Sequence, residues 1–375
     1  MKKIDDIRKD INEIDKKLVR LFEKRMSIVG EIAENKIETG KAVYDSKREQ
    51  EVIKRALNYS NNKSFTNYTK DFFEQLMDIS KKYQYSLVPI QKKTIINTNK
   101  KGLSVGFQGV SGSFSDSAVD YLYDQNIIRR NYKSFEQLFI AVLKGEIEEG
   151  VVPYENTSTG GVYDVLDLLR KYDLFIVAQF DVTINHCLLG ISGSKLDDIK
   201  MVYSHPQALL QCSKFLNNNK EILEYPYANT AIAAKDIAIW GEKYKGAIAS
   251  KKAAKLYNLE ILIENLQDNS LNTTRFIVVK NKLEIKENAS KTSIIFTSAH
   301  VPGALYNILK SFYLNNINIT RIESRPNINR KFEYYFYLDF LGTVNDKSVI
   351  NAISDAKKNC GYFKILGSYS VKGEK

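Results

Sequence analysis

The sequence predicts a multidomain protein made of an all-α N-terminal domain, an α/β domain and a C-terminal domain with a ferredoxin-like βαββαβ order. Its 375 residues exceed one ordinary domain of about 100–200 residues. The hydrophobic pattern changes near residue 103 from helical periodicity to short apolar runs separated by helical stretches. A polar stretch rich in lysine and asparagine precedes this change. We expect domains over residues 1–85, 103–282 and 292–375, with a linker over 86–102.

The N-terminal domain should begin with one amphipathic helix over residues 4–36. Apolar residues recur there at spacings of three and four, the pattern of a coiled-coil seam. A helix of about 33 residues is about 50 Å long, too long for a small domain to cover, so we expect it to pack against a second chain. Two further helices are expected over 45–60 and 70–85. The seam consists of Ile4, Ile7, Ile11, Ile14, Leu18, Leu21, Ile28 and Ile32.

The α/β domain should contain a largely parallel sheet, because its short apolar runs alternate with helices. Ser134, with Gln137 three residues later, and Thr230 are predicted to cap two of these helices. Ligands of such sheets bind beyond the carboxyl ends of the strands, so the turns that follow strands are the places to look for a site. The predicted strands cover residues 104–108, 150–153, 174–177, 201–203, 246–249 and 276–279.

The C-terminal domain should alternate strands and helices in the order βαββαβ. Its predicted strands cover 293–297, 318–324, 333–341 and 363–371, and its predicted helices cover 303–314 and 347–359.

The composition is that of a soluble globular protein, with 43% hydrophobic and 26% charged residues. The formal net charge of +11 favours an anionic partner, either nucleic acid, an acidic membrane or small polycarboxylates. Three cysteines and three histidines are scattered without CxxC or HExxH spacing, which argues against zinc or iron–sulfur chemistry. We expect no metal and no cofactor. No apolar run approaches the roughly 18 residues of a membrane span, and the N-terminus does not have the pattern of a signal peptide. We therefore expect a cytoplasmic protein that does not bind membranes.

Arg25 interrupts the apolar seam of the first helix between Leu21 and Ile28. A buried, unpaired guanidinium is costly, so Arg25 needs an anionic partner, either a glutamate of a helical bundle or a ligand. Lys36 projects onto the same helix face about 16 Å further along, whereas Arg8 projects about 100° away. One helix cannot direct all three cations at one point, but two crossing helices can.

Four strings in the N-terminal domain carry a family resemblance: IDDIRKDINEIDKKLVRLFEKR, GEIAENK, VYDSKREQEVI and DISKKYQ. Through them residues 4–84 resemble the all-helical chorismate mutase family. The resemblance implies a dimer that interlocks its long first helices, with Arg8 reaching the pocket of the partner chain. The local pocket that it implies consists of Arg25, Lys36, Asp45, Arg48, Glu49, Ser80 and Gln84.

The chemistry of such a pocket requires no nucleophile and no proton transfer, because chorismate rearranges to prephenate in one pericyclic step. Arginine side chains can hold its two carboxylates and thereby fix the reactive conformer. Lys36 and Gln84 are the expected catalytic residues, donating hydrogen bonds to the ether oxygen on which charge develops. Glu49 and the backbone near Asp45 would receive the ring hydroxyl.

Three turns of the α/β domain crowd polar side chains at strand ends: PYENTSTGG (153–161), YSHPQ (203–207) and NTTRF (272–276). Taken singly, each fits ordinary turn and cap chemistry. With the strings VVPYENTSTGGVYDVLDLL and VYSHPQALLQCSKFL around them, they make residues 103–280 resemble prephenate dehydratase. The resemblance implies two α/β subdomains with a cleft between them and catalysis that depends on Thr274. The expected substrate-binding residues are Glu155, Asn156, Thr157, Ser158, His205, Thr273, Thr274, Arg275 and Phe276.

The dehydratase reaction removes water and carbon dioxide from prephenate to give phenylpyruvate, and aromatisation drives it. The hydroxyl of Thr274 is too weakly acidic for an ordinary general acid, so we expect it to donate a hydrogen bond to the departing oxygen. Arg275 would offer charge to a carboxylate and Phe276 an apolar wall. Either Glu155 or His205 would assist proton delivery.

The turn GVSGSFSD at 109–116 matches none of the patterns GxxxxGK[ST], GxGxxG and GxSxG. Its backbone N–H groups and hydroxyls open onto a helix, where they would either cap that helix or hold a carboxylate.

Two strings of the C-terminal domain, PGAL at 302–305 and ESRP at 323–326, resemble an ACT domain of the phenylalanine-sensing kind. Glycine at position 303 would let the backbone approach a bound amino acid. The alternative is a ferredoxin-like dimerisation module without a ligand. The expected phenylalanine-binding residues are Gly303, Ala304, Leu305, Glu323, Ser324, Arg325 and Pro326.

The sequence as a whole predicts a bifunctional chorismate mutase–prephenate dehydratase, a homo-oligomer (dimer or tetramer) under feedback control by phenylalanine. One alternative is a prephenate dehydratase alone, whose helical segment serves dimerisation. Another is a non-catalytic amino-acid sensor or a basic nucleic-acid binder, but we expect no nucleic-acid partner because the chain has no RNP-like motif or recognition helix.

Overall fold

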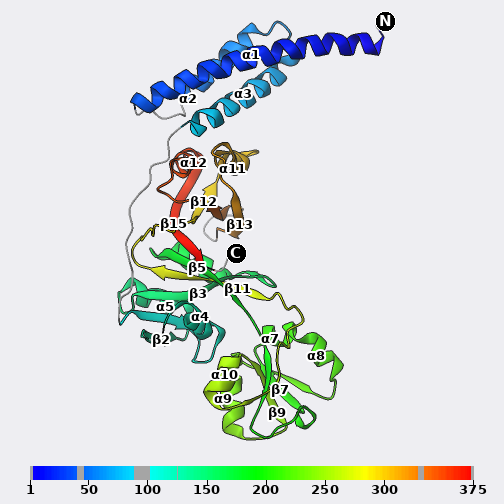
Figure 1. Cartoon of the computed structure of the whole chain (residues 1–375), viewed down its shortest axis with the longest axis vertical. Helices are drawn as coiled ribbons and strands as arrows, with labels where there is room; N and C mark the ends of the chain where they lie inside the picture. The colour runs from blue at the N-terminus through cyan, green and yellow to red at the C-terminus, as the bar shows by residue number, and fades with distance from the viewer. Residues whose placement is uncertain (1–2, 40–45, 88–101, 125, 328–332, 373–375) are drawn as a thin grey trace. The chain divides into compact units, whose positions relative to one another are not determined.

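The computed structural model describes residues 3–39, 46–87, 102–124, 126–327 and 333–372. The chain forms two compact units, one of residues 1–93 with 296–363 and one of residues 94–295 with 364–375 (Figure 1). Strands β12 (Lys291–Ser298) and β15 (Cys360–Lys372) contribute residues to both units.

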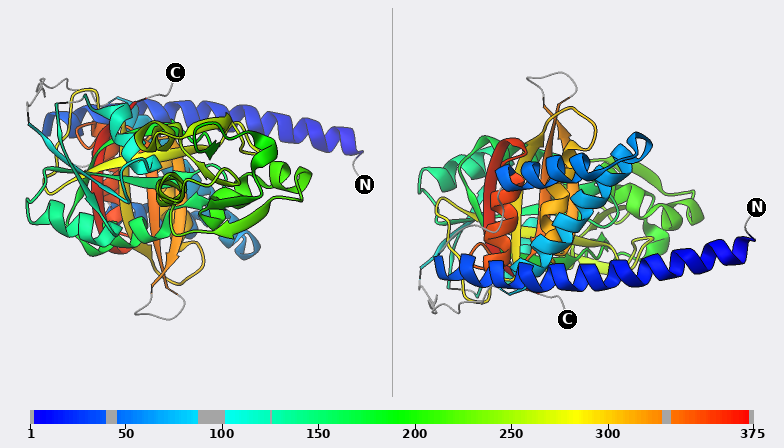
Figure 2. Two further views of the ribbon diagram at one scale, coloured as in Figure 1. Left: turned by 90° about the horizontal axis from the view of Figure 1, so that it is seen from below. Right: turned by 90° about the horizontal axis from the view of Figure 1, so that it is seen from above.

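The first unit begins with the three helices that the periodicity predicts. They are α1 (Ile4–Thr39), α2 (Ser46–Tyr59) and α3 (Thr66–Ser86), and α3 starts four residues before the predicted position. The N-terminal half of α1 runs beyond α2 and α3 (Figures 1 and 2). All described side chains before Arg25 on this helix are exposed, so the described residues leave this part of its apolar seam uncovered.

The C-terminal elements follow the predicted βαββαβ order. Between β12 and β15 lie α11 (Ala304–Leu314), β13 (Ile319–Pro326), β14 (Tyr334–Leu341) and α12 (Lys347–Lys357). Strands β13 and β14 pair in antiparallel fashion, and α11 packs against α12. The rings of Phe312 and Phe340 lie 4.8 Å apart in the buried core of this part.

The second unit contains a first lobe built on a sheet of strand order β15-β5-β11-β3-β1-β2. This sheet is mixed, so the prediction of a largely parallel sheet is wrong. Strand β1 pairs in parallel with β2 and β3, whereas β11 is antiparallel to both β3 and β5. The sheet is mixed because the chain leaves this lobe along β5 and returns along β11, which lies beside β5 and runs in the opposite direction. The elements are β1 (Ser104–Gln108), α4 (Phe114–Leu122), β2 (Ile128–Tyr132), α5 (Phe135–Leu143), β3 (Glu149–Asn156), β4 (Gly160–Gly161), α6 (Tyr163–Lys171), β5 (Phe175–Thr183) and β11 (Thr273–Lys280).

A second lobe of this unit is formed by the chain between β5 and β11, on a sheet of order β10-β6-β9-β7-β8 (Figure 1). Its core includes Leu188, Val202 and Ile248, all fully buried. The elements are β6 (Cys187–Gly190), β7 (Met201–Ser204), α7 (Pro206–Gln211), α8 (Ser213–Asn218), β8 (Leu223–Pro226), α9 (Thr230–Trp240), β9 (Lys245–Ala249), α10 (Lys251–Tyr257) and β10 (Glu260–Ile263).

The two predicted helix caps differ in outcome. Ser134 caps α5 as expected, because its Oγ accepts a hydrogen bond from the backbone N–H of Gln137 at 3.2 Å. The cap of α9 is Asn229 rather than Thr230, since Oδ1 of Asn229 accepts from the backbone N–H of Ala231 at 2.8 Å.

Two segments join the lobes of the second unit, and they run side by side. The backbone N–H of Ile184, leaving β5, donates to the carbonyl of Asn272, entering β11, at 2.8 Å. The backbone N–H of Leu266 donates to the carbonyl of His186 at 2.8 Å. This double crossing is where polar side chains of both lobes meet.

Candidate active sites

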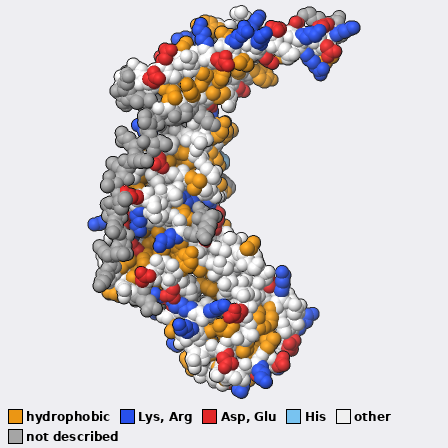
Figure 3. Space-filling view, in the orientation of Figure 1, with side chains coloured by type: hydrophobic (Ala, Val, Ile, Leu, Met, Phe, Trp, Pro, Cys, Tyr) orange, Lys and Arg blue, Asp and Glu red, His pale blue; other side chains and the backbone are white. Residues whose placement is uncertain are grey.

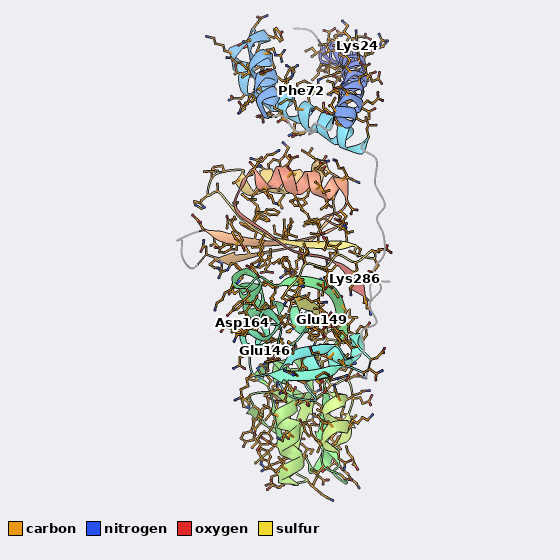
Figure 4. All side chains as sticks on the ribbon, turned by 90° about the vertical axis from the view of Figure 1, so that its left-hand side faces the viewer. Lys24, Phe72, Glu146, Glu149, Asp164 and Lys286 are labelled. Atoms are coloured by element: carbon orange, nitrogen blue, oxygen red, sulfur yellow. The ribbon has the colours of Figure 1, made fainter. Side chains whose placement is uncertain are left out.

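The first cavity lies among α1, α2 and α3 and has a volume of about 440 Å³. Lys24 marks α1 and Phe72 marks α3 in Figure 4. Among the described residues, four cationic side chains and one carboxylate line this cavity, and this balance favours an anion. The polar lining residues are Arg25, Lys36, Arg48, Glu49, Arg55, Tyr59, Ser80 and Gln84.

Arg25 points from α1 into this cavity and is half-buried. Its Nη1 donates a hydrogen bond to Oγ of Ser80 on α3, and that hydroxyl donates to the carbonyl of Leu76 at 2.6 Å. Burial lowers the pKa of the Arg25 guanidinium from its ordinary value. Because Ser80 is neutral, this contact orients the guanidinium without neutralising its charge.

Gln84 lies one helical turn beyond Ser80 and is 8% exposed. Its Oε1 is buried and has no hydrogen-bond partner among the described residues. A buried amide oxygen without a partner is costly, so it indicates a position that a bound ligand completes.

Arg8 was expected in the pocket of the partner chain, not in the pocket of its own chain. Arg8 is 17 residues before Arg25, about 25 Å along the same helix, and its exposed side chain lies 3.5 Å from Asp5. Asp45 falls outside the described residues. The structure therefore does not bring Arg8 to the cavity of its own chain.

Arg55 also lines the cavity, although the sequence analysis did not select it. It follows Arg48 and Val52 at spacings of seven and three on α2, so the three residues share one helix face. This helical spacing is the sequence feature from which Arg55 could have been predicted to line the cavity.

The second cavity lies between the two lobes of the second unit and has a volume of about 640 Å³. Its lining includes residues at the starts of α4, α6 and α9, namely Ser113 to Ser115, Val162 to Asp164, and Asn229 with Thr230. Helix N-termini carry partial positive charge and unpaired N–H groups, and they favour anions. Asp164, labelled in Figure 4, is the one acidic residue of the lining, which contains no lysine or arginine from the described part of the chain.

Strand β11 directs Thr274 and Phe276 into this cavity but not Arg275 between them. Successive side chains of a strand point to opposite faces. The guanidinium of Arg275 lies 3.0 Å from Oε2 of Glu155 and 3.1 Å from Oδ1 of Asp181. The expectations that Arg275 meets a substrate carboxylate and that Glu155 faces the substrate therefore do not match this arrangement.

Asn156 organises the polar end of the cavity and is 8% exposed. Its Oδ1 accepts hydrogen bonds from the backbone N–H groups of Ser158 at 2.9 Å and Thr159 at 3.2 Å. Its Nδ2 must then face the other way, where it donates to Oγ1 of Thr274 and to Oδ1 of Asn272, each at 2.9 Å. Since the Thr274 oxygen accepts this bond, its own hydrogen remains available to a ligand.

Of the other expected residues, His205 lines the cavity, whereas Thr157, Ser158 and Thr273 do not. Nδ1 of His205 accepts from the backbone N–H of Gln207 at 3.2 Å, which caps α7. The residues that sequence reasoning missed include His186, Gln207 and Gln211, which line the same cavity from the second lobe.

The turn at 109–116 holds a carboxylate, and that carboxylate belongs to the chain itself. Oδ2 of the buried Asp116 accepts from the backbone N–H of Gly112 at 2.9 Å and lies 2.7 Å from Nζ of Lys252 on α10. Gly112 has a φ of +87°, a conformation that favours glycine. This turn therefore ties the first lobe to the second beside the cavity.

The two C-terminal motifs lie on different elements. Gly303, with a φ of +77°, precedes α11, and Ala304 and Leu305 form its first turn. Glu323 to Pro326 form the end of β13, where Glu323 pairs in register with Tyr337 and Arg325 with Tyr335 of β14.

Two further kinds of feature are absent from the described ranges. No group of three or more His, Cys, Asp or Glu side chains is placed to hold a metal ion. No helix there combines the length and the apolar character needed to cross a membrane.

Both parts of the chain that contain a cavity match known protein families. Residues 7–85 match the family Chorismate mutase type II, and residues 105–284 match the family Prephenate dehydratase. The bifunctional chorismate mutase/prephenate dehydratase of Buchnera aphidicola subsp. Acyrthosiphon pisum is 31% identical over 369 residues, which cover 96% of this chain and 95% of that protein.

Two solved structures resemble the part of the chain beyond the helices. Prephenate dehydratase from Arthrobacter aurescens in complex with L-Phe has a TM-score of 0.66 and 29% identity, covering 72% of this chain and 90% of that chain. GqqA, described as a novel type of quorum quenching acylase, has a TM-score of 0.66 and 31% identity, covering 72% of this chain and 98% of that chain. The Buchnera protein matches both parts of this chain at 31% identity over nearly the whole length of each protein, which shows the family. This chain therefore belongs to the family of bifunctional chorismate mutase/prephenate dehydratases.

Proposed function

We propose that this chain rearranges chorismate to prephenate in the helical cavity and converts prephenate to phenylpyruvate in the cavity between the lobes. The observation that carries the proposal is the presence of two separate cavities with different chemistry. The first is lined by cations, and the second by hydroxyls, amides and helix N-termini. Both substrates are dianions, and both linings favour negative charge.

In the helical cavity, Arg25 and Arg48 would hold carboxylates of chorismate, with Arg55 adding a third cation at the same helix face. Lys36 and Gln84 would donate hydrogen bonds to the breaking ether oxygen, on which negative charge develops. Gln84 lines the cavity, so its Nε2 group would make this bond. Its buried Oε1, which has no partner among the described residues, would accept a hydrogen bond from a donor on the ligand.

We propose a homo-oligomer, at least a dimer, in which Arg8 completes the helical cavity of the partner chain. The apolar seam of α1 supports this, since Ile4, Ile11 and Leu18 are 65%, 51% and 46% exposed. Figure 3 shows hydrophobic side chains gathered along the helical segment. A second copy that covers this seam would stabilise the assembly by part of the about 1.5–3 kcal/mol that full burial of an exposed aliphatic side chain contributes, because these side chains are already about half covered.

In the cavity between the lobes, Thr274 would donate a hydrogen bond to the departing oxygen of prephenate. The contact from Asn156 supports this role, because it leaves the Thr274 hydrogen free to point at a ligand. The substrate carboxylates would be bound by N–H groups and hydroxyls at the starts of α4 and α9 rather than by Arg275. His205 is favoured over Glu155 for proton delivery, since His205 lines the cavity and Glu155 is paired with Arg275.

We further propose that the C-terminal segment is an ACT domain that binds phenylalanine through residues 303–305 and 323–326. The left-handed Gly303 before α11 and the L-Phe complex of the Arthrobacter protein support this assignment. Binding there would shift the dehydratase between states of different affinity and lower its rate. Glu323→Ala and Arg325→Ala are expected to relieve the inhibition, and a wild-type rate that is unaffected by millimolar phenylalanine would rule the regulation out. The cytoplasmic location expected from the sequence remains part of this proposal.

The mutase assignment is tested with Lys36→Ala and with Lys54→Ala, an exposed lysine of α2 that does not line the cavity, as its matched control. Chorismate loss is expected to fall by at least about 100-fold in the first variant, the scale of one lost transition-state donor. It should be unchanged in the control. If the wild-type chain forms phenylpyruvate from prephenate but does not consume chorismate, the alternative of a dehydratase with a helical dimerisation segment is correct.

A further inference from the structure

His186 is a histidine of the cavity between the lobes that no motif selected. It lies on the segment between β5 and β6, is 2% exposed and lines the cavity. Its ring packs edge-on against Phe114, another lining residue, with ring centroids 5.1 Å apart. Nε2 lies 2.9 Å from Oε1 of Gln211, whereas Nδ1 has no hydrogen-bond partner among the described residues.

A chain of amides determines which nitrogen of His186 carries the proton. The orientation of Asn156 is set by backbone N–H groups, and its Nδ2 donates to Oδ1 of Asn272 at 2.9 Å. The Nδ2 group of Asn272 then donates to Oε1 of Gln211 at 3.1 Å. The same oxygen of Gln211 faces His186, so Nε2 must be the donor in that contact. Nδ1 is therefore an unprotonated acceptor, on a residue that lines the cavity.

The environment keeps this imidazole neutral. Burial lowers the pKa of His186 below its ordinary value of 6.5, and the hydrogen bond to Gln211 offsets only part of that effect. A neutral ring with Nε2 protonated offers one lone pair, at Nδ1, and a buried lone pair without a partner is costly to leave unmatched.

We infer that Nδ1 of His186 accepts a hydrogen bond from the ring hydroxyl of prephenate. The inference rests on the proposed dehydratase function. The two carboxylates and the ketone of prephenate only accept hydrogen bonds, so its ring hydroxyl is the one group that can donate to Nδ1. The same chain of amides leaves the Thr274 hydroxyl free to donate and Nδ1 of His186 free to accept. The ring hydroxyl of prephenate can accept the first bond through its oxygen and donate the second through its hydrogen.

The two residues then have different roles. The bond to His186 is made by the intact hydroxyl, so it contributes to substrate binding and to the direction of the carbon–oxygen bond. The bond from Thr274 strengthens as that oxygen takes up charge. Loss of the first should therefore raise KM with little change in kcat, and loss of the second should lower kcat.

The test uses the full chain carrying His186→Gln, in which the new amide still donates toward Gln211 while the acceptor at the Nδ1 position is lost. KM for prephenate is expected to rise about 3- to 10-fold, the usual scale of one net hydrogen bond, with kcat within about twofold. Phenylpyruvate, which lacks the hydroxyl, is the control ligand, and its inhibition constant should not change. An unchanged KM, or equal weakening of prephenate and phenylpyruvate, would overturn the inference.

His186→Asn is the second variant, because its Oδ1 can take the place of Nδ1. It is expected to keep KM closer to the wild-type value than His186→Gln does, and a KM as high as in His186→Gln would contradict the acceptor role. Chorismate consumption by each variant reports on the integrity of the chain. If the wild-type enzyme forms no phenylpyruvate from prephenate, the dehydratase proposal itself fails, which is distinct from a failure of the role given to His186.

Discussion

Replacing Asn156 by aspartate is expected to slow phenylpyruvate formation while leaving chorismate consumption unchanged. The amide makes six hydrogen bonds of 2.9–3.4 Å. Its Oδ1 accepts from the backbone N–H groups of Ser158 and Thr159 and from the Thr159 hydroxyl. Its Nδ2 donates to Oγ1 of Thr274, to Oδ1 of Asn272 and to the carbonyl of Thr273. Aspartate has the same shape and keeps the accepting oxygen. Its second oxygen accepts where the amide donated, so Thr274 would turn its hydrogen toward the new carboxylate and away from the ligand.

The size of the effect follows from the strength of that new bond. A hydrogen bond to a charged group contributes about 1.5–3 kcal/mol, and each 1.36 kcal/mol corresponds to a factor of about ten in rate. Diverting the Thr274 hydroxyl should therefore lower kcat about 10- to 150-fold.

The assay compares kcat for prephenate in Asn156→Asp, Thr274→Val and the double variant. If the carboxylate acts through Thr274, the double variant should be no slower than the slower single variant, because the same hydrogen bond is lost in each. Losses that multiply, or a wild-type kcat in Asn156→Asp, would refute the reasoning. The unfolding temperature and the chorismate rate show whether the variant remains folded.

Three further predictions concern other parts of the chain. Ile11→Glu places a charge on the exposed seam of α1 and should dissociate the oligomer and abolish chorismate turnover while prephenate turnover persists; sedimentation of the variant as the wild-type species would contradict the interlocked dimer. Burial raises the pKa of the Cys212 thiol to about 12, so at pH 8 this cysteine should react with a disulfide reagent only after unfolding, and rapid labelling of Cys212 in the folded protein would disagree. Asp116→Asn removes the charge that faces Lys252 and Arg129, and we expect about 1–3 kcal/mol lower free energy of unfolding; an unchanged denaturation midpoint would show that the turn at 109–116 does not depend on this ion pair.

The elements were predicted well where the hydrophobic period was clear. The three N-terminal helices and the βαββαβ order follow from period and spacing alone, and the structure has them at nearly those bounds. Strand β2 was missed because its sequence, IRRNY, is polar and half-exposed, so it has no apolar run. The antiparallel pairing of β11 with β5 was not predicted. The direction of this pairing depends on where the chain returns after the second lobe, and the local sequence does not encode that position.

The candidate site residues were likewise predicted well where helix spacing places them and poorly where distant parts of the chain do. Arg25, Lys36, Ser80 and Gln84 meet because they lie on regular helices, whose faces can be read from spacing. Arg275 was expected in the substrate cavity although the alternation of a strand already separates it from Thr274. His186 had no local signal, since its tautomer depends on Gln211 and Asn272, which are 25 and 86 positions away in the sequence.

The central claim, two independent active sites in one chain, is tested most directly by mixing two purified variants and following phenylpyruvate formed from chorismate. Lys36→Ala should convert added prephenate but not chorismate, and Thr274→Val should consume chorismate and accumulate prephenate. Neither alone should carry chorismate to phenylpyruvate, and the mixture should restore that conversion. A mixture that stays inactive, or variants that each lose both reactions, would contradict the account.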